Sequence, residues 1–304
     1  KEGEKEEEHK NQNGCCVDKS LLQTSPLYRQ PLFMHSPSLS IVSWNCKKLS
    51  NHNNLMTPEL MKDWRDAAME LTKYDIVLLQ EVPEKADFRL RNFVTDMEYN
   101  GDEWSWETSE ASGPNKGKEK HVILVKKHIR IENFRTAPSK FDHSPGTFKV
   151  VVPGFEGPVV ITSVHFPPSF SSARREQRDA QIKDFTESYV AYEEYRLGTP
   201  FTKKGASDAR LPFSMHIIAG DFNANRNQLL KLVNNGDWHC MLEQFHTTSN
   251  NAFDNILVNR DAQKFVFSSA RVMRMRRMSS PIESGISDHS PILGSFIMSP
   301  KQAD

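Results

Sequence analysis

The sequence predicts an α+β fold in which large sheets pack on each other and helices lie outside them. Short apolar segments of strand length outnumber the helical segments, and two long helical segments stand between groups of strands. The 304 residues are enough to bury a core without disulfides or metal ions. No solenoid-type repeat is visible that would favour another architecture.

The N-terminal segment differs in composition from the rest of the chain. Residues 1–14 read KEGEKEEEHKNQNG, a charged stretch without apolar periodicity, and we expect residues 1–36 to form a disordered arm. Apolar segments begin at Ser38 and continue almost to the end of the chain. We therefore expect residues 37–304 to form one domain.

The elements of this domain are expected in a definite order. A strand at 39–45, LSIVSWN, precedes a helix at 58–71 whose apolar residues recur at helical spacing, and a second strand follows at 74–82. The remaining segments are strands at 121–127, 147–152 and 158–166, a long helix at 171–195, a strand with a polar tip at 214–225, and strands at 253–258, 264–272 and 289–298.

Composition and charge exclude several classes of protein. The 39 basic and 39 acidic residues balance, so no overall field indicates a nucleic-acid partner, although a balanced total can hide a basic face. No apolar run reaches the roughly 18 residues that a membrane span needs. The four cysteines show no disulfide framework and no zinc spacing, and no Asn-x-Ser/Thr glycosylation site occurs. We expect an intracellular protein, nuclear or cytoplasmic, with a secreted one as the alternative.

Polar side chains that can bind metal or move protons stand at the ends of the apolar strands. Strand ends in packed sheets converge, so these groups are expected to line one cleft. A turn residue is the alternative interpretation at any single position, above all for Asp288 and His289 in GISDHSPILG. The set comprises Asn45, Glu81, His165, Asp221, Asn223, Asp254, Asp288 and His289.

The residue types in this set fit the hydrolysis of a phosphoester. Asn, Glu and Asp offer the hard oxygen ligands that Mg²⁺ or Ca²⁺ prefers over zinc. Two histidines with nearby carboxylates suit a general base and a general acid. A metal that neutralises charge, a base that activates water and an acid that protonates the leaving oxygen together perform this reaction.

The ordered segments SWN, YDIVLLQEV, HVILVKK, SVHFPP, GDFNA, AFDNILV and SDHSP resemble the endonuclease/exonuclease/phosphatase superfamily, and within it the deoxyribonuclease I group, over residues 39–298. The resemblance implies a four-layer α/β/β/α sandwich of two mainly antiparallel sheets with outer helices. It further implies a monomeric, Mg²⁺-dependent DNA endonuclease, in which Mn²⁺ can substitute and Ca²⁺ can take part.

The same resemblance implies a role for each residue of the set. Asn45, Glu81 and Asp288 would bind metal, while Asp221 and Asn223 would bind metal or the scissile phosphate. The general acid would be His165, oriented by Glu119, and the general base would be His289, oriented by Asp254. Ser249 would contact phosphate.

The chain departs from the deoxyribonuclease I pattern at positions that hold DNA. Pro83 stands where the group has an Arg, and Gly117 stands where it has a Tyr. The alternatives are the same chemistry on RNA or a phospholipid head group, or a non-catalytic member that binds nucleic acid. Other phosphate contacts are expected from two basic segments. The first is ARREQR, with Arg174, Arg175 and Arg178, for which an exposed helix start is the alternative. The second is RVMRMRRM, with Arg271, Arg274, Arg276 and Arg277, for which a solvated loop or strand edge is the alternative.

Overall fold

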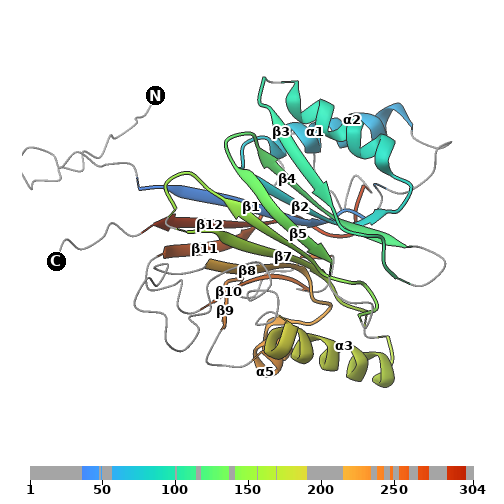
Figure 1. Ribbon diagram of the computed structural model, residues 1–304. Coiled ribbons are helices and arrows are strands. Elements are labelled where there is room, and N and C mark those ends of the chain that lie inside the picture. The colour runs from blue at the N-terminus through green and yellow to red at the C-terminus, as the bar shows by residue number, and fades with distance from the viewer. Residues whose placement is uncertain are drawn as a thin grey trace, which may run out of the picture. The chain divides into compact units, whose positions relative to one another are not determined.

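Strands in the described part of the chain form two six-stranded sheets that pack face to face (Figure 1). The structure is a computed structural model that describes residues 36–47, 49, 57–99, 101–113, 118–136, 141–155, 157–168, 170–189, 215–233, 238–242, 247–248, 253–259, 266–273 and 286–298. All of them belong to the unit Ser36–Asp304. Except for Ser36, the arm expected at 1–36 lies outside the described residues and stays a prediction.

The first sheet has the strand order β11-β12-β1-β2-β4-β3. Its strands are β1 (Ser38–Asn45), β2 (Ile76–Pro83), β3 (Trp104–Thr108), β4 (Glu119–Lys126), β11 (Val266–Val272) and β12 (Ile292–Met298). The second sheet has the order β5-β6-β7-β8-β10-β9. Its strands are β5 (Arg130–Thr136), β6 (Gly146–Val151), β7 (Val159–His165), β8 (Met215–Asp221), β9 (Trp238–Cys240) and β10 (Asp254–Asn259).

Helices cover the outer face of each sheet (Figure 1). The first sheet carries α1 (Pro58–Leu71) and α2 (Asp87–Glu98), and the second carries α3 (Ser172–Asp184) and α5 (Arg226–Leu232). A π-helical turn, Phe185–Tyr189, continues α3. None of the described helices is both long enough and apolar enough to span a membrane. The predicted fold, two packed, mainly antiparallel sheets with outer helices, is confirmed.

Apolar side chains alternate between the two faces of the central strands and contribute to three buried layers. In β2, Ile76 and Leu78 face the second sheet, whereas Val77 and Leu79 face α1 and α2. The same period of two holds in β1, so both faces of the strand are apolar and buried. The middle layer lies between the sheets, and the outer layers lie under the two helix pairs.

The helices begin where the sequence provides caps. The Thr57 side chain accepts a hydrogen bond from the Leu60 amide, and Pro58 occupies the first turn, where its missing N–H costs nothing. Ser171 caps α3 in the same way. Asn225 and Gln228 form a reciprocal capping box at α5. The bounds of α1 agree with the prediction at both ends, but α2, α5, β5 and β9 were not predicted.

One parallel pair lies near the middle of each sheet. β1 pairs in parallel with β2, and β7 with β8, while every other pair of neighbours is antiparallel. Each parallel pair is joined through a crossover that contains a helix, α1 or α3. The carboxyl ends of both strands of a pair therefore lie at the same edge of their sheet, together with the amino ends of the antiparallel neighbours β4, β10 and β12.

Gly220 permits the close pairing of β7 and β8. Its φ is +148°, and a Cβ on this residue would lie 2.0 Å from the carbonyl oxygen of Val164. No side chain fits there unless the two strands separate. Asp221, the next residue, depends on this backbone for its position.

We predict that Gly220→Ala lowers the free energy of unfolding by about 3–5 kcal/mol, because it combines positive-φ strain with a backbone clash. The matched control is Gly101→Ala. Gly101 has a φ of +87° but open space around its Cα, so only about 1 kcal/mol of backbone strain is expected. Urea unfolding of both variants measures the difference. Equal losses would contradict the close approach at Gly220.

Candidate active site

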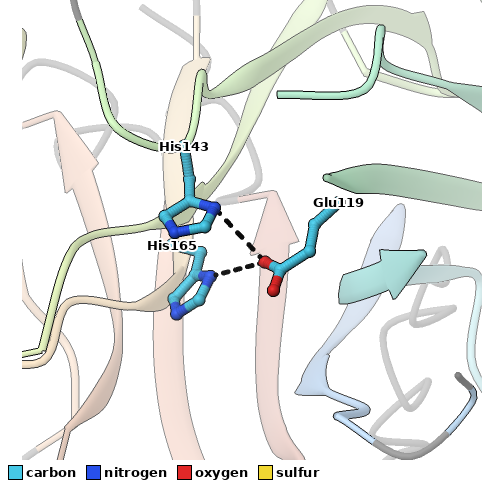
Figure 2. A group of neighbouring side chains, drawn as sticks. All are labelled: Glu119, His143 and His165. Atoms are coloured by element: carbon cyan, nitrogen blue, oxygen red, sulfur yellow. Dashed lines mark hydrogen bonds and ion pairs between the residues drawn. The ribbon is translucent and has the colours of Figure 1, made fainter. Parts of the chain in front are cut away.

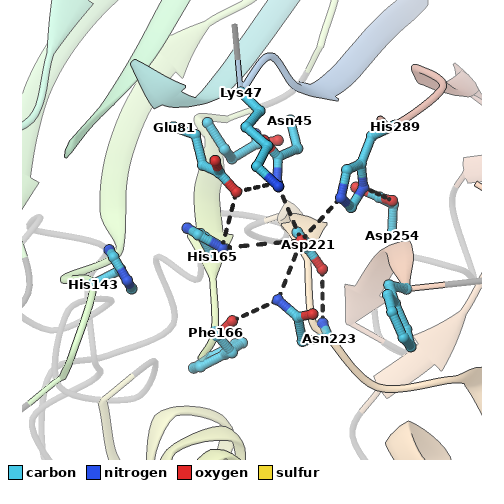
Figure 3. A network of polar contacts seen from close by, with 12 residues as sticks. Asn45, Lys47, Glu81, His143, His165, Phe166, Asp221, Asn223, Asp254 and His289 are labelled. Atoms are coloured by element: carbon cyan, nitrogen blue, oxygen red, sulfur yellow. Dashed lines mark hydrogen bonds and ion pairs between the residues drawn. The ribbon is translucent and has the colours of Figure 1, made fainter. Parts of the chain in front are cut away.

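The polar strand ends meet at one edge of the sheet pair, where Figure 3 shows them around Asp221. Asn45 and Glu81 come from the carboxyl ends of β1 and β2, and His165 and Asp221 from those of β7 and β8. The remaining members stand at or before the amino ends of antiparallel neighbours: Glu119 on β4, Asp254 on β10 and His289 before β12. The sheet topology thus brings the predicted set together.

Asp221 lies at the centre of the cluster and contacts residues of both sheets. Asn45 Nδ2 donates a hydrogen bond to Asp221 Oδ2 at 3.1 Å, and the Asn223 amide donates to Oδ1 at 2.8 Å. The same Oδ2 lies 4.0 Å from His165 Nε2 and 3.6 Å from His289 Nε2. Burial and the charge of Asp254 raise the pKa of Asp221 to about 6, although the two imidazoles oppose the shift.

Two non-glycine residues of the site have left-handed backbone conformations. Glu81 has a φ of 55° and Asn223 a φ of 48°. Glu81 lies in a β-bulge, because the pairing of β2 with β4 shifts register between Leu79 and Val82. Such residues store about 1–3 kcal/mol of strain each and are frequent at functional sites. The bulge turns the Glu81 carboxylate towards Asn45 Nδ2, at 2.7 Å.

His165 stands between two carboxylates, one on each ring nitrogen. Its Nδ1 lies 3.1 Å from Glu119 Oε2, and its Nε2 lies 3.3 Å from Glu81 Oε1. Burial alone would lower the pKa of His165, but the hydrogen bond to Glu119 and the charges of Glu81 and Asp221 raise it to about 9. Burial alone would raise the pKa of Glu119, but His165 holds it below the ordinary value.

His289 has a single strong partner and a fixed backbone. Its Nδ1 lies 2.7 Å from Asp254 Oδ2. Trp44 Nε1 donates to its carbonyl at 3.0 Å, and its amide donates to Ser287 Oγ at 3.1 Å. Burial alone would lower the pKa of His289, but the charge and hydrogen bond of Asp254 raise it to about 10. A carboxylate on Nδ1 leaves Nε2 as the nitrogen that faces the cluster.

Asp288 lies at the rim of the cluster. Its side chain is 52% exposed and pairs with Lys47, whose Nζ is 2.8 Å from Asp288 Oδ2. Burial would raise the pKa of Asp288, but the hydrogen bond from Lys47 lowers it. Its Oδ1 lies 4.0 Å from His289 Nε2. The metal-binding role expected for Asp288 stays a prediction.

The residues around Asn45 fit a divalent cation. Asn45 Nδ2 donates to two carboxylates, and its buried Oδ1 has no hydrogen-bond partner in the described part of the chain. A buried oxygen without a hydrogen-bond partner costs free energy of folding unless a ligand bonds to it. Four carboxylates, those of Glu81, Glu119, Asp221 and Asp254, face two imidazoles here. When all four carboxylates are ionised and both rings are protonated, two negative charges are left over. One divalent cation would balance them.

A buried polar layer supports the site from below. Gln80 Nε2 donates to Ser163 Oγ at 2.9 Å and to Ser43 Oγ at 3.2 Å, which joins the two sheets. The Ser163 hydroxyl lies 3.0 Å from His121 Nδ1. Because Ser163 Oγ accepts from Gln80, its own hydrogen is free to be donated to His121. Burial, followed by the charges of His165 and His143, lowers the pKa of His121 to about 3, so this ring is neutral.

The expected phosphate contacts are only partly described. Ser249, Arg274, Arg276 and Arg277 lie outside the described residues, and their roles stay predictions. Arg174 and Arg175 are exposed at the start of α3, and Arg174 Nη1 pairs with Asp142 Oδ2 at 3.1 Å. They are not within the cluster, but Arg174 lines a cavity of about 680 Å³ that reaches His143.

Sequence reasoning missed two residues that the structure brings to the site, His143 and Lys47, and gave a third, Arg178, another role. His143 lies beside His165, with ring centroids 4.6 Å apart. Lys47 reaches the rim from the loop after β1. Arg178 was expected to contact phosphate, with an exposed helix start as the alternative, but it is buried, pairs with Asp179 and donates to the Asn223 carbonyl. For Arg178, the available signal was a charged residue on the inner face of α3. For His143 there was no signal, because its segment, FDHSP, resembles an ordinary turn.

Comparisons with known proteins identify a family profile and several structures of similar fold. The profile of the Endonuclease/Exonuclease/phosphatase family matches residues 42–289. A comparison with curated protein sequences finds no match.

Several solved structures share the fold at low sequence identity. Truncated TDP2 from Caenorhabditis elegans has a TM-score of 0.56 and 16% identity, over 86% of this chain and 98% of that one. TDP2 from D. rerio, complexed with a single strand DNA product, has a TM-score of 0.55 and 17% identity, over 85% and 98%. ANGEL2, a 2′,3′-cyclic phosphatase in complex with adenosine-2′,3′-vanadate, has a TM-score of 0.59 and 12% identity, over 87% and 97%.

We predict that His121 makes the protein acid-sensitive. Its folded pKa is about 3, below the unfolded value of about 6.5, so between these values the unfolded state binds a proton that the folded state does not. Stability from this group is complete above about pH 6.5 and falls as the pH decreases. Between pH 7 and pH 5 the loss is about 2 kcal/mol.

The matched variant is His121→Asn, whose amide oxygen replaces Nδ1 as acceptor and does not titrate. Urea unfolding at both pH values, compared between the two proteins, isolates this group from other titrations. The same pH dependence in the variant would show that His121 is not the source.

Proposed function

This protein belongs to the Endonuclease/Exonuclease/phosphatase family, and we propose that it is a Mg²⁺-dependent nuclease that cuts the phosphodiester backbone of DNA. One observation carries the proposal. Two imidazoles, each with a carboxylate on Nδ1, direct their Nε2 atoms at the same Asp221 oxygen from opposite sides (Figure 3). An in-line displacement at phosphorus needs a base on one side and an acid on the other.

The two histidines divide the proton transfers. We assign the general base to His289, which acts in its neutral form: the carboxylates alone favour the charged ring, and bound Mg²⁺ would oppose that charge. Its Nε2 then takes a proton from the attacking water while Asp254 stabilises the charge that forms on the ring. We assign the general acid to His165, whose Nε2 gives its proton to the leaving oxygen. Glu119 orients His165 and keeps it protonated before the transfer, as the raised pKa of His165 indicates. The choice of acid and base rests on the family resemblance.

The remaining residues bind and orient. Asn45 and Glu81 would hold Mg²⁺, which supplies positive charge to the phosphate when bound. Asn223 Nδ2 donates to Phe166 O at 2.8 Å and to Asp221 Oδ2 at 3.2 Å, and thereby fixes the central carboxylate. Arg178 fixes Asn223 in turn through its carbonyl. Lys47 at the rim can attract a phosphate to the cluster.

The surface next to His143 carries groups suited to holding a nucleic-acid strand, which supports the proposal. The adjoining cavity is lined by Lys118, Arg174 and Phe170, whose side chain is 90% exposed. Cations together with an exposed aromatic ring are the groups with which proteins hold single strands. The likeness to TDP2 with its single strand DNA product supports the same substrate class.

A phosphoester of RNA is the second candidate substrate. Pro83 occupies a position where the deoxyribonuclease I group has an arginine, so one duplex contact is missing. The structural likeness to ANGEL2 in complex with adenosine-2′,3′-vanadate, a ribonucleotide ligand, favours RNA as the alternative. Plasmid DNA, single-stranded DNA and RNA, each tested with Mg²⁺, separate the candidates.

We predict that His165→Ala and His289→Ala each reduce Mg²⁺-dependent nicking of supercoiled plasmid by about 10²–10⁴-fold, because each removes one proton transfer. The exposed His128→Ala serves as the matched control and should cut at the wild-type rate. EDTA should stop all cleavage. A site variant that nicks as fast as the wild type would remove that histidine from its assigned role.

We predict that Asn45→Ala raises the Mg²⁺ concentration for half-maximal cleavage by about tenfold or more, because it removes the oxygen assigned to the cation. A second readout does not need activity: Mg²⁺ should raise the melting temperature of the wild type more than that of the variant. Asn92→Ala, an exposed change on α2, is the control. If Asn45→Ala responds to Mg²⁺ like this control, the cation does not bind there.

A further inference from the structure

Glu119, His143 and His165 form a second group of ligating atoms beside the reaction centre (Figure 2). Glu119 Oε2 lies 3.1 Å from His165 Nδ1 and 3.3 Å from His143 Nδ1. The two rings are tilted by 31° with their centroids 4.6 Å apart. The proposed reaction employs Glu119 and His165 but gives His143 no part.

Two of the three ligand-atom distances in this group match those of a tetrahedral zinc site, and all three ligand atoms lie within 4.8 Å of one another. Zinc binds nitrogen and carboxylate oxygen at about 2.0–2.1 Å, so two ligand atoms at a tetrahedral angle are about 3.3 Å apart. Both oxygen–nitrogen distances are close to that value. Two imidazoles and a carboxylate are ligands of zinc and similar transition metals, whereas Mg²⁺ prefers oxygen alone. This group therefore differs in metal preference from the one around Asn45.

His143 has the properties of an available ligand. Its Nδ1 is buried and makes no hydrogen bond within the described part of the chain, despite its closeness to Glu119. A neutral imidazole nitrogen with an unused lone pair is the form that binds a metal.

The loop that carries His143 is held on several sides. Asp142 accepts hydrogen bonds from Gln177 Nε2 at 3.0 and 3.1 Å, which ties the loop to α3. The Ser144 amide donates to Ser112 Oγ at 2.8 Å, and Ser112 pairs with Glu119 through the backbone. His143 and Glu119 are thus fixed relative to each other through Ser112. The cavity of about 680 Å³ is lined by His143 and gives solvent access for a fourth, water ligand.

We propose that Glu119, His143 and His165 bind a zinc-type transition-metal cation, and that the bound cation inhibits the enzyme. Zinc bonds to the Nδ1 lone pair of His165 once the Nδ1 proton has left to solvent. The proton that remains on Nε2 then belongs to a neutral, metal-bound ring, which is a weaker acid than imidazolium. Inhibition rests on the proposed function, but metal binding does not.

Metal binding is tested on the full chain without substrate. With Mg²⁺ present to fill the oxygen-rich site, Zn²⁺ is titrated by calorimetry, and Co²⁺ by the visible absorption that reports nitrogen coordination. His143→Ala should weaken binding by about tenfold or more, since even the loss of an outer-shell partner costs that much. His143→Phe keeps the stacked ring without the nitrogen and should weaken binding equally. His128→Ala controls for surface histidines. Wild-type affinity in both His143 variants would overturn the site.

Inhibition is tested by plasmid nicking in Mg²⁺, with each variant compared with its own zinc-free rate. Zinc should inhibit the wild type at concentrations about tenfold lower than those needed for either His143 variant. A tenfold increase in Mg²⁺ should not restore the wild-type rate. Restoration would place the inhibiting ion at Asn45 and Glu81 and overturn the inhibitory role. If no substrate is cut, the binding titration alone decides the metal site, so the two proposals fail separately.

Discussion

The buried carboxylate of Asp221 is the group on which the arrangement of the site depends. It ends β8 in the second sheet, yet it accepts a hydrogen bond from Asn45 at the end of β1 in the first. Both imidazoles to which we assign the proton transfers approach the same oxygen, Oδ2. Without these partners a buried carboxylate would be too costly to keep charged. Its position in turn requires the glycine before it, because only Gly220 allows β7 and β8 to approach so closely.

Charge in the cluster is arranged as linked pairs. Each imidazole is stabilised by a carboxylate on Nδ1, and each carboxylate is stabilised by the ring it orients. Asp221 differs from Glu119 because it lies deeper and close to another acid, Asp254, which makes its proton harder to remove. The residues to which we assign the reaction therefore also create an excess of negative charge. In our proposals, that excess attracts cations to two adjoining groups of different ligand chemistry.

The sequence was sufficient to predict the sheets and the position of most site residues, because apolar strands that end in polar groups follow a period of two and converge at a sheet edge. The helix α2 was missed although Leu90, Phe93, Val94 and Met97 repeat at helical spacing, since charged residues separate them. His143 could not be assigned from sequence: it belongs to a loop, and only tertiary packing brings it to His165. The bulge at Glu81 was equally hidden, because a register shift depends on the partner strand.

The two sheets supply the site in nearly equal shares, with Asn45, Glu81 and Glu119 from the first and His165 and Asp221 from the second. Neither sheet holds a working set by itself. A partly folded chain could keep all of its strands and still lack the site, if the apolar layer between the sheets had loosened as in a molten globule. Activity would then be lost before secondary structure. In this architecture, a loss of catalysis would indicate that the apolar layer between the two sheets has loosened.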